Sequence, residues 1–334
     1  LTHLIGKGNY VSPQDISSSI ISILKLDPII EKAIHKRIET KEYTDFLETI
    51  SALSELPLLI QLMKSCPIPN LDFELLLSDL RKKFLTYLPC IKENQKANDF
   101  LLALSLQCFT NEYVYNETEH ETDLVNKLIE FIIDKLNSGK QPRKLEILCL
   151  SSYRALYKYD WCKRLMLPKD LDEILTRLIS EPIEEKQSIS SIPRLDKVRN
   201  PVSAKVQEQY EENPYPRWIN IGLHLNPSTI SEVIEDIGYL RLSSSIIKRV
   251  DAPEILIAGC GTGQHSIETA RRFKKSRVLA IDLSYASLSY AKRKTKELGF
   301  QNITYLQADI LNLKKLNKKF DIIESSGVLH HTHN

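Results

Sequence analysis

The chain has 334 residues, enough for about two domains, and 42% of them are hydrophobic, an ordinary share for a protein with sizeable cores. Its 45 Lys and Arg nearly balance 43 Asp and Glu, so the formal net charge of +2 indicates no strong field for nucleic acid or an acidic membrane surface. The six cysteines form no C-x-x-C pair, which argues against a zinc site and against a disulfide framework.

Charged and apolar runs give further information about the partners and cellular environment of the protein. Three basic runs (271–277, 292–296 and 314–319) lie in the last third of the chain, and we expect solvated helix or loop faces there rather than a nucleic-acid surface. No apolar stretch approaches the roughly 20 residues of a membrane span, and no signal peptide is evident. We therefore expect a reducing, cytoplasmic setting without a membrane partner, although a chain that begins with Leu1 rather than Met leaves room for a leader.

Helices dominate the first half of the chain. Apolar residues recur there at spacings of three and four, which predicts an all-helical domain over residues 1–180. Three of its helices, over 72–85, 121–136 and 171–179, each follow a second apolar segment, so helix pairs recur at intervals of about 45 residues, as in helical repeat arrays. The pairs share little sequence, so an irregular helical domain remains the alternative.

The composition then changes. Residues 181–200 are rich in Ser, Pro and charge without sustained periodicity, which is typical of a linker. Residues 201–212 predict a short helix with proline in its first turn, and the prolines of "NPYPRW" (213–218) predict an extended, rigid stretch. Another helix is expected next, with Ser228 or Thr229 as its cap.

From Pro253 onward, strands alternate with helices. Ser284 suits the N-cap of the second of these helices, and Gly299 suits its C-terminal stop. Such alternation predicts a parallel sheet with helical crossovers, so the chain as a whole belongs to the α/β class. The predicted strands cover 254–259, 277–284, 302–309 and 320–326, and the predicted helices cover 264–276 and 285–299.

The segment "EILIAGCGTGQHSIETA" joins the first of these strands to the first helix through Gly259, Gly261 and Gly263. A helix N-terminus at the carboxyl end of a parallel strand binds anionic or polar groups through its free N–H donors. The nicotinamide and flavin fingerprint requires G-x-G-x-x-G, but its third glycine would fall at position 264, which is Gln264. The spacing therefore disfavours a dinucleotide as the ligand.

Gly259-Cys260-Gly261-Thr262-Gly263 resembles the G-x-G-x-G motif of class I S-adenosylmethionine-dependent methyltransferases. Three further features follow in that family's order. Asp282 ends the second strand, Asp309 ends the third, and "FDIIESSGVLHH" (320–331) is similar to the family's fourth strand and the loop beside the methyl acceptor. The resemblance implies a Rossmann-like methyltransferase domain over residues 201–334, with S-adenosyl-L-methionine as cofactor.

The resemblance also implies the contacts of the cofactor. The amides from Gly261 to Gln264 would receive its carboxylate end, Asp282 its ribose hydroxyls, and Asp309 with Ile310 its purine. Considered from the residues alone, Asp282 is also a candidate helix cap and Asp309 a candidate loop start. The full set implied for the cofactor is Gly259, Cys260, Gly261, Thr262, Gly263, Gln264, Asp282, Leu283, Asp309, Ile310 and Ser326.

The segment "YEENPYPRW" (210–218) resembles one that precedes the methyltransferase domain in a bacterial group with helical, tetratricopeptide-like N-terminal regions. Tyr215, Arg217 and Trp218 would either fold over the cofactor as a lid or form a rigid strap that packs Trp218 into the domain junction. Its "NPYP" differs from the Asn-Pro-Pro-Tyr motif of amino-methylating enzymes, because the order is changed and the segment precedes the first strand.

The chain closes with "HHTHN", which contains His330, His331 and His333. No metal site is expected, because no acidic or sulfur ligand is adjacent. The resemblance places these residues in the loop under the methyl acceptor. There His330 or His331 would act as general base for an O–H or N–H acceptor, or would only pack against the cofactor.

We therefore expect methyl transfer to an unidentified acceptor, with a protein partner bound by the helical domain. The alternatives are a helical scaffold with an inert Rossmann-like domain, and a nicotinamide-dependent oxidoreductase. The family's sheet has seven strands, in the order 3-2-1-4-5-7-6, and this chain stops after the fourth. The resemblance thus implies an incomplete sheet with an exposed apolar edge, and a protein that ended there naturally would aggregate or lack methyl transfer.

Overall fold

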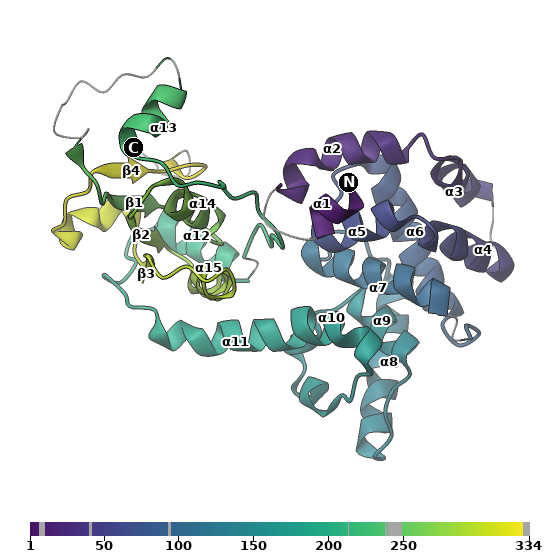
Figure 1. The fold of residues 1–334 in the computed structure, drawn as a ribbon. Helices are drawn as coiled ribbons and strands as arrows, with labels where there is room; N and C mark the ends of the chain where they lie inside the picture. Colours follow the sequence, from purple (N-terminus) through teal and green to yellow (C-terminus); the bar gives the residue numbers. More distant parts are fainter. Residues whose placement is uncertain are drawn as a thin grey trace. The chain divides into compact units, whose positions relative to one another are not determined.

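The computed structural model describes the whole chain except residues 7–10, 40–41, 93–94, 213, 238, 240–248 and 330–334. The chain divides into two compact units, Leu1–Pro182 and Ile183–Asn334 (Figure 1). The division falls inside a helix, α11 (Glu181–Ser188), and not at residues 180 and 200 as the composition suggests.

The first unit is built from α-helices, as the apolar spacing predicts. The three helices expected at 72–85, 121–136 and 171–179 correspond to α6, to α8, and to α10 with its π-helical continuation η4 (Thr176–Ser180). The α-helices are α1 (Thr2–Gly6), α2 (Pro13–Leu24), α3 (Pro28–Glu39), α4 (Tyr43–Ser54), α5 (Pro57–Ser65), α6 (Leu71–Tyr87), α7 (Gln95–Thr110), α8 (Glu119–Asn137), α9 (Lys144–Ser151) and α10 (Asp172–Leu175), with short 3-10 turns at Leu156–Lys158, Asp160–Arg164 and Lys169–Leu171.

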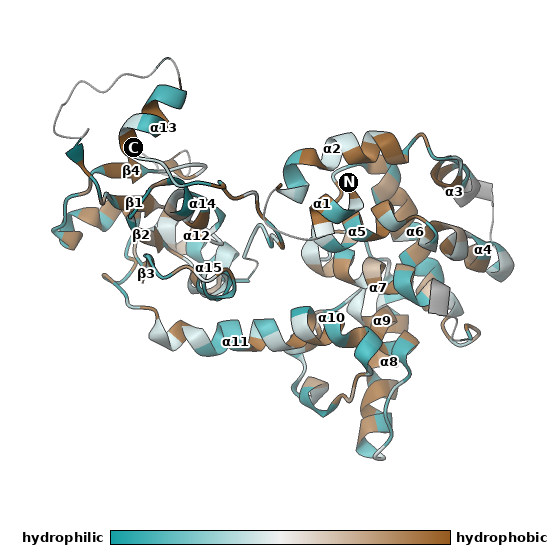
Figure 2. Cartoon of the chain, in the orientation of Figure 1, coloured by the Kyte–Doolittle hydropathy of each residue, from teal (hydrophilic) through white to brown (hydrophobic). Residues whose placement is uncertain are grey.

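Helix α8 shows why these segments are helical. Thr118 and Glu121 form a reciprocal capping box, in which the Thr118 side chain accepts from the Glu121 N–H and the Glu121 carboxylate accepts from the Thr118 N–H. Val125, Leu128 and Ile132 recur at helical spacing and are buried. Figure 2 shows the same division into apolar and polar sides on the helices of this unit.

Helices with equivalent places in successive pairs pack against one another. Helix α5 contacts α7, α7 contacts α9, and α6 contacts α8. The Oγ of Ser105 on α7 also donates a hydrogen bond to the carbonyl oxygen of Leu148 on α9, at 2.7 Å. Nearest-neighbour stacking of this kind builds the continuous core of repeat arrays. The third pair has only the short α10 with η4 as its second member, and a true repeat stays a prediction.

The second unit contains a four-stranded sheet in the order β3-β2-β1-β4, with every neighbouring pair parallel. The predicted alternation is confirmed, and with it the fold class: a helical N-terminal unit followed by a parallel, Rossmann-like α/β unit. The strands are β1 (Glu254–Ala258), β2 (Arg277–Asp282), β3 (Ile303–Gln307) and β4 (Ile322–Glu324), and the helices are α12 (Pro201–Glu212), α13 (Ile230–Asp236), α14 (Gln264–Arg272), α15 (Tyr285–Glu297) and the 3-10 helix η7 (Ile310–Leu316).

Side chains cover both faces of the central strand. Ile255 and Ile257 of β1 pack with apolar residues of α14 and α15, whereas Leu256 and Ala258 pack on the opposite face with residues of η7. A strand buried on both faces requires the nearly continuous apolar run that β1 has. Strand β4 lies at the edge of the described sheet, and its Ile323 is 63% exposed. The effect of this edge on solubility or activity stays a prediction.

The predicted linker, residues 181–200, is part of the fold. The carboxylate of Glu185 accepts a hydrogen bond from the Arg293 Nε at 2.8 Å, with both side chains buried. Farther along, the Gln307 N–H at the end of β3 donates to the Pro193 carbonyl oxygen at 2.9 Å. Polar composition suggested a linker, but here it serves a buried ion pair and covers the edge of a strand.

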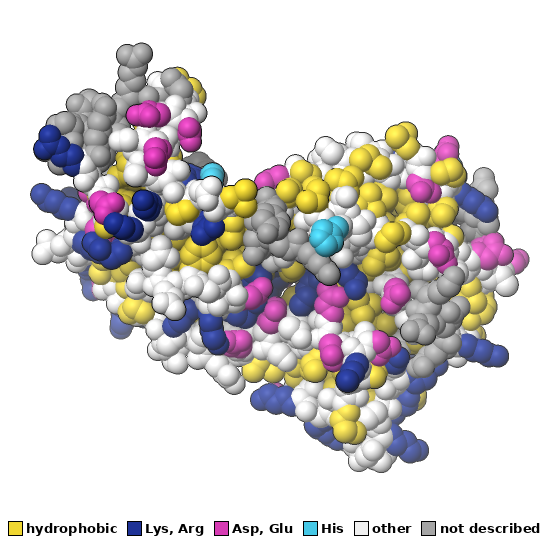
Figure 3. Space-filling view, viewed as in Figure 1, with side chains coloured by type: hydrophobic (Ala, Val, Ile, Leu, Met, Phe, Trp, Pro, Cys, Tyr) yellow, Lys and Arg dark blue, Asp and Glu magenta, His cyan; other side chains and the backbone are white. Residues whose placement is uncertain are grey.

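Charges on the surface are mixed. Acidic and basic side chains are interspersed on the face drawn in Figure 3. Residues of the basic runs make ion pairs, such as Lys275 with Asp251 at 2.5 Å and Lys296 with Glu184 at 2.9 Å. In the described part of the chain no single helix is long and apolar enough to cross a membrane, and the one pair that passes by length and composition, α4 with α5, is bent by 87°.

Candidate functional site

The chain turns after β1 on the glycines of the motif, for two different physical reasons. Gly263 has a φ of +87° and is the N-cap of α14, and a Cβ added there would lie 2.5 Å from the Cβ of Ala291. Helix α15 therefore packs directly on the backbone of the turn. Gly261 has a φ of +52°, and nothing lies within 4 Å of an added Cβ, because this part of the turn borders a cavity.

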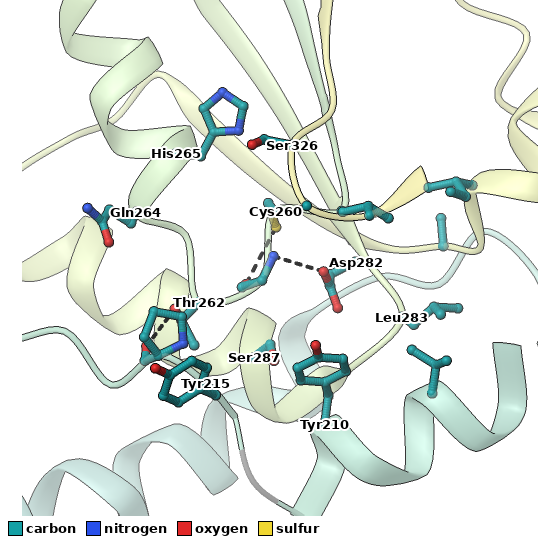
Figure 4. A pocket seen from close by; sticks show the side chains of 18 of the residues that line it. Tyr210, Tyr215, Cys260, Thr262, Gln264, His265, Asp282, Leu283, Ser287 and Ser326 are labelled. Carbon is teal, nitrogen blue, oxygen red and sulfur yellow. Dashed lines mark hydrogen bonds between the residues drawn. The ribbon is translucent and has the colours of Figure 1, made fainter. Parts of the chain in front are cut away.

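A cavity of about 520 Å³ opens beside this turn, a size usual for small-molecule sites (Figure 4). Its walls come from the ends of β1, β2 and β3, the segment after β4, and α12. All but one of the residues predicted for the cofactor line it, the exception being Gly263, which is buried against Ala291 instead. The lining residues from that set are Gly259, Cys260, Gly261, Thr262, Gln264, Asp282, Leu283, Asp309, Ile310 and Ser326.

Asp282 is hydrogen-bonded to the glycine turn. Its Oδ2 accepts a hydrogen bond from the Gly261 N–H at 2.8 Å, drawn in Figure 4, and its Oδ1 accepts from the Ser284 N–H at 3.0 Å. Burial raises the pKa of this carboxyl, and the backbone hydrogen bonds offset only part of that effect. A carboxylate has about four acceptor sites, so these backbone donors leave capacity for a ligand hydroxyl. Asp282 does not cap α15, because the Ser284 side chain does so by accepting from the Ser287 N–H.

Only some amides of the turn are available to a ligand. The Gly261 N–H is bonded to Asp282, and the Gly263 N–H donates to the Cys260 carbonyl oxygen at 3.0 Å. Within the described residues, the N–H groups of Thr262 and Gln264 have no hydrogen-bond partner. The expected run of free amides from 261 to 264 is thus reduced to these two, because the turn satisfies the others internally.

Asp309 follows β3 and is 3% exposed. Its Oδ1 accepts from the Leu311 N–H at 2.9 Å, so it does begin η7, as the loop-start alternative predicts. Its Oδ2 is buried and has no partner among the described residues. A buried carboxylate oxygen without a donor is costly, so a ligand donor reaching the cavity wall here would be favoured.

One face of α12 also lines the cavity, and the sequence analysis missed it. Ser203, Val206 and Tyr210 lie three and four residues apart, which places them on the same side of the helix. Helical spacing just before the "NPYPRW" segment was the available signal. Glu211 fixes this helix in place, because its carboxylate accepts from the Tyr285 N–H at 2.7 Å and from the next N–H of α15 at 2.9 Å.

Trp218 is a strap and not a lid. It is 4% exposed, and its indole Nε1 donates to the Thr262 carbonyl oxygen at 3.1 Å. The Thr262 hydroxyl in turn donates to the Pro216 carbonyl oxygen at 2.8 Å. Trp218 therefore packs inside the second unit, on the glycine turn. Arg217 is also buried, whereas Tyr215 is 53% exposed and lines the cavity, so the lid role stays a prediction for Tyr215.

A second missed residue is His265, at the start of α14. Its Nε2 lies 2.8 Å from Oε2 of Glu324 on β4, and the Thr269 hydroxyl donates to the same oxygen at 2.7 Å. His265 lines the cavity, and Figure 4 draws it beside Ser326. The separation of the pair in sequence, 59 residues, hides it from any local pattern.

The general-base role of the terminal histidines stays a prediction. His330 and His331, the predicted general bases, lie outside the described residues, as does His333. Burial, with the neighbouring carboxylate of Asp282, raises the pKa of the Cys260 thiol well above its usual range. Cys260 is therefore a neutral wall residue and not a nucleophile.

Comparison with known proteins agrees with this geometry. Residues 255–334 match the family model described as a methyltransferase domain. The matched part contains β1 to β4, the glycine turn and both acids at the strand ends. The second unit thus carries a methyltransferase-like domain.

Curated relatives also match part of this chain. A release factor glutamine methyltransferase of Flavobacterium psychrophilum is 32% identical over 111 residues, which cover 33% of this chain and 38% of that protein. A malonyl-[acyl-carrier protein] O-methyltransferase of Paenibacillus is 34% identical over 93 residues, covering 26% of this chain and 34% of that protein. An uncharacterized protein of Rickettsia prowazekii is 28% identical over 123 residues, 36% of this chain and 44% of that protein. The chain thus spans less than half the length of these relatives.

Among solved structures, coclaurine N-methyltransferase bound to N-methylheliamine and SAH is 15% identical and covers 61% of this chain and 48% of that chain. The TM-score is 0.22, which supports no conclusion about a shared arrangement.

Proposed function

We propose that the second unit binds S-adenosyl-L-methionine and transfers its methyl group to an acceptor. The observation that carries this proposal is the placement of Asp282 and Asp309, at the ends of adjacent parallel strands, on one cavity with the glycine turn. Carboxylates are the strongest acceptors for ligand hydroxyl and amino groups. The match of residues 255–334 to a methyltransferase domain supports the same function.

Different residues of the cavity suit different parts of this cofactor. The free N–H groups of Thr262 and Gln264 suit its carboxylate end, Asp282 its ribose hydroxyls, and the unpartnered Oδ2 of Asp309 its purine amino group. Leu283 and Ile310 offer apolar contact to the purine. When bound, the cofactor supplies a methyl group on a positively charged sulfur, so the protein mainly has to align it and exclude water.

The same geometry argues against a nicotinamide cofactor. A pyrophosphate needs several convergent N–H donors at the turn. Among the described residues, only the N–H groups of Thr262 and Gln264 are available there.

Titration calorimetry with the full chain tests the cofactor. We expect S-adenosylmethionine and S-adenosylhomocysteine to bind, and NAD to bind at least tenfold more weakly. Asp282→Ala should lower the affinity about tenfold or more, which corresponds to roughly 1.4 kcal/mol. Asp309→Asn keeps the hydrogen bond to Leu311 but replaces the free oxygen by a donor, so it should also weaken binding. The control is Asp251→Ala, an exposed partner of Lys275 outside the cavity. Equal affinity in all four proteins would refute the site.

Transfer of a labelled methyl group from S-adenosylmethionine to an acceptor then distinguishes an enzyme from an inert scaffold. Binding without transfer to any acceptor would favour a scaffold. The relatives are named for different acceptors, a release-factor glutamine and a malonyl-[acyl-carrier protein], so none is carried over to this chain. We also propose that the helical unit recruits a protein partner. A further proposal is that the protein is cytoplasmic, as its balanced charge and scattered cysteines suggest.

A further inference from the structure

The pairing of His265 with Glu324 is the strongest feature of the cavity that cofactor binding does not use. The Glu324 carboxylate receives two donors on Oε2, from His265 and Thr269, and the Arg272 guanidinium lies 3.9 Å from its Oε1. Burial alone would raise the pKa of Glu324, but the hydrogen bonds from His265 and Thr269, with the nearby Arg272 charge, hold the pKa below the usual value. Glu324 is therefore an ionised acceptor at neutral pH.

An ionised carboxylate decides which ring nitrogen carries the proton. Glu324 can only accept, so the His265 Nε2 must be the N–H donor of their 2.8 Å contact. In the neutral ring, Nδ1 is then the lone-pair nitrogen. No residue in the described part of the chain hydrogen-bonds to this Nδ1, and the ring lines the cavity beside Ser326. A histidine held by a carboxylate, with its other nitrogen facing a cavity, is the geometry of a proton acceptor.

A purely structural role explains less of the geometry. Thr269 and Arg272 already join Glu324 to α14, so β4 and α14 do not need His265 to connect them. The His265 side chain is 30% exposed, in a wall of the cavity and not in the core. The ring thus occupies a position where a bound molecule can reach it.

We propose that His265 accepts the proton of the methyl acceptor, that Glu324 positions the ring, and that the acceptor is an O–H or N–H group that is neutral before transfer. This inference depends on the proposed function. The acceptor's lone pair bonds to the methyl carbon, the carbon–sulfur bond breaks with its electron pair left on sulfur, and the acceptor's proton moves to Nδ1. The Glu324 carboxylate stabilises the resulting imidazolium, which later releases the proton to water.

The first test does not depend on activity. The full chain is labelled with ¹⁵N in its histidines, and the His265 signals are assigned by their loss in His265→Gln. At a pH where the ring is neutral, we expect the proton on Nε2 in the wild type. Glu324→Gln should raise the share of the other tautomer, whereas Glu324→Asp should preserve the wild-type preference. A neutral ring with its proton on Nδ1, or no response to Glu324→Gln, would overturn the proposal.

The second test measures transfer of labelled methyl groups from S-adenosylmethionine to a panel of small phenols, alcohols, amines and thioethers. We expect label on phenols, alcohols or amines, and a fall in kcat of about 100-fold or more for His265→Gln with a smaller change in KM. The matched control is His224→Gln, the same change at an exposed histidine of the second unit outside the cavity.

The outcomes separate this inference from the proposed function. S-adenosylmethionine binding together with transfer only to thioethers, transfer to none of these acceptors, or a wild-type kcat in His265→Gln would overturn the inference and leave cofactor binding intact. Failure of the wild type to bind S-adenosylmethionine would overturn both.

Discussion

The indole Nε1 of Trp218 donates a hydrogen bond to the carbonyl oxygen of Thr262, 3.1 Å away, and thereby ties the segment before the sheet to the glycine turn. Lys294 lies 4.9 Å over the Trp218 ring and donates to the Ile219 carbonyl oxygen at 2.9 Å, which holds the same segment on α15. The turn that borders the cavity is thus fixed from outside by a side chain that does not line it.

Replacing Trp218 by Phe tests this relationship. The change keeps most of the apolar area but removes the hydrogen bond to the turn, so we expect a loss of about 1 kcal/mol in the stability of the second unit and weaker binding of S-adenosylmethionine. Trp161→Phe is the matched control, because the buried Nε1 of Trp161 has no hydrogen-bond partner in the described part of the chain. Urea unfolding and calorimetry measure both effects. Equal losses of stability in the two variants, with unchanged binding in both, would mean that the hydrogen bond does not support the turn.

Close packing on the turn predicts that replacing Gly263 by Ala destabilises the protein much more than replacing Gly299 by Ala. Gly263→Ala places a Cβ 2.5 Å from Ala291 Cβ and 2.9 Å from its Cα, at a φ of +87°. Gly299→Ala has a similar φ, +76°, but nothing within 4 Å of the new Cβ. We expect Gly299→Ala to cost about 1 kcal/mol for backbone strain, and Gly263→Ala to cost at least 2 kcal/mol more because α15 must move. Similar unfolding midpoints for the two variants would contradict this packing.

The first unit contains a buried charge that predicts a large stability effect. Arg81 is 1% exposed, donates to the Asn116 carbonyl oxygen at 2.7 Å, and lies 3.8 Å from the buried carboxylate of Glu121, to which Tyr153 also donates at 2.8 Å. Arg81→Ala leaves that carboxylate without its counter-charge, so we expect a loss of about 3–5 kcal/mol in urea unfolding.

The control for Arg81 is Lys83→Ala on the same helix. Lys83 makes an i,i+4 ion pair with Asp79 at 2.8 Å, with both side chains partly exposed. Its loss should cost less than about 1 kcal/mol. If the two variants unfold at the same urea concentration, the Arg81 cluster is not the stabilising feature that its geometry indicates.

Acid should weaken the first unit through Glu117. Hydrogen bonds from Arg154, at 2.6 and 2.7 Å, are the main cause that lowers the pKa of Glu117 below its usual 4.5. A carboxyl whose pKa is lowered in the folded state stabilises that state above the unfolded pKa, and this stability is lost as the pH falls through the folded value. We therefore expect stability to decline as the pH drops below about 4.5.

Glu117→Gln should be less stable at neutral pH and should lose less stability in acid. Glu119→Gln, the same change at an exposed position two residues away, should keep the acid sensitivity of the wild type. Thermal unfolding from pH 7 to pH 3 measures the three proteins. A Glu117→Gln profile parallel to the wild type would show that the Arg154 pair does not contribute to the acid response.

The features that could be predicted from residue patterns are local or periodic. Helical spacing located α6 and α8, alternation with apolar runs located the parallel strands, and the glycine spacing with Asp282 and Asp309 located most of the cavity wall. These features depend on neighbouring residues, because strand burial, helix caps and turn geometry all have short repeats in the chain.

Features that depend on partners far apart in the chain became visible only in the folded protein. It showed that Asp282 already uses the Gly261 N–H and that Trp218 donates to Thr262. It also showed that Oδ2 of Asp309 has no partner among the described residues, and that Glu324 contacts His265 across 59 residues. Whether each of these hydrogen bonds forms depends on how distant segments pack. No repeating pattern in the sequence predicts it. A polar residue that looks like part of a solvated helix start, such as His265, can therefore become a site residue only when the sheet brings its partner close.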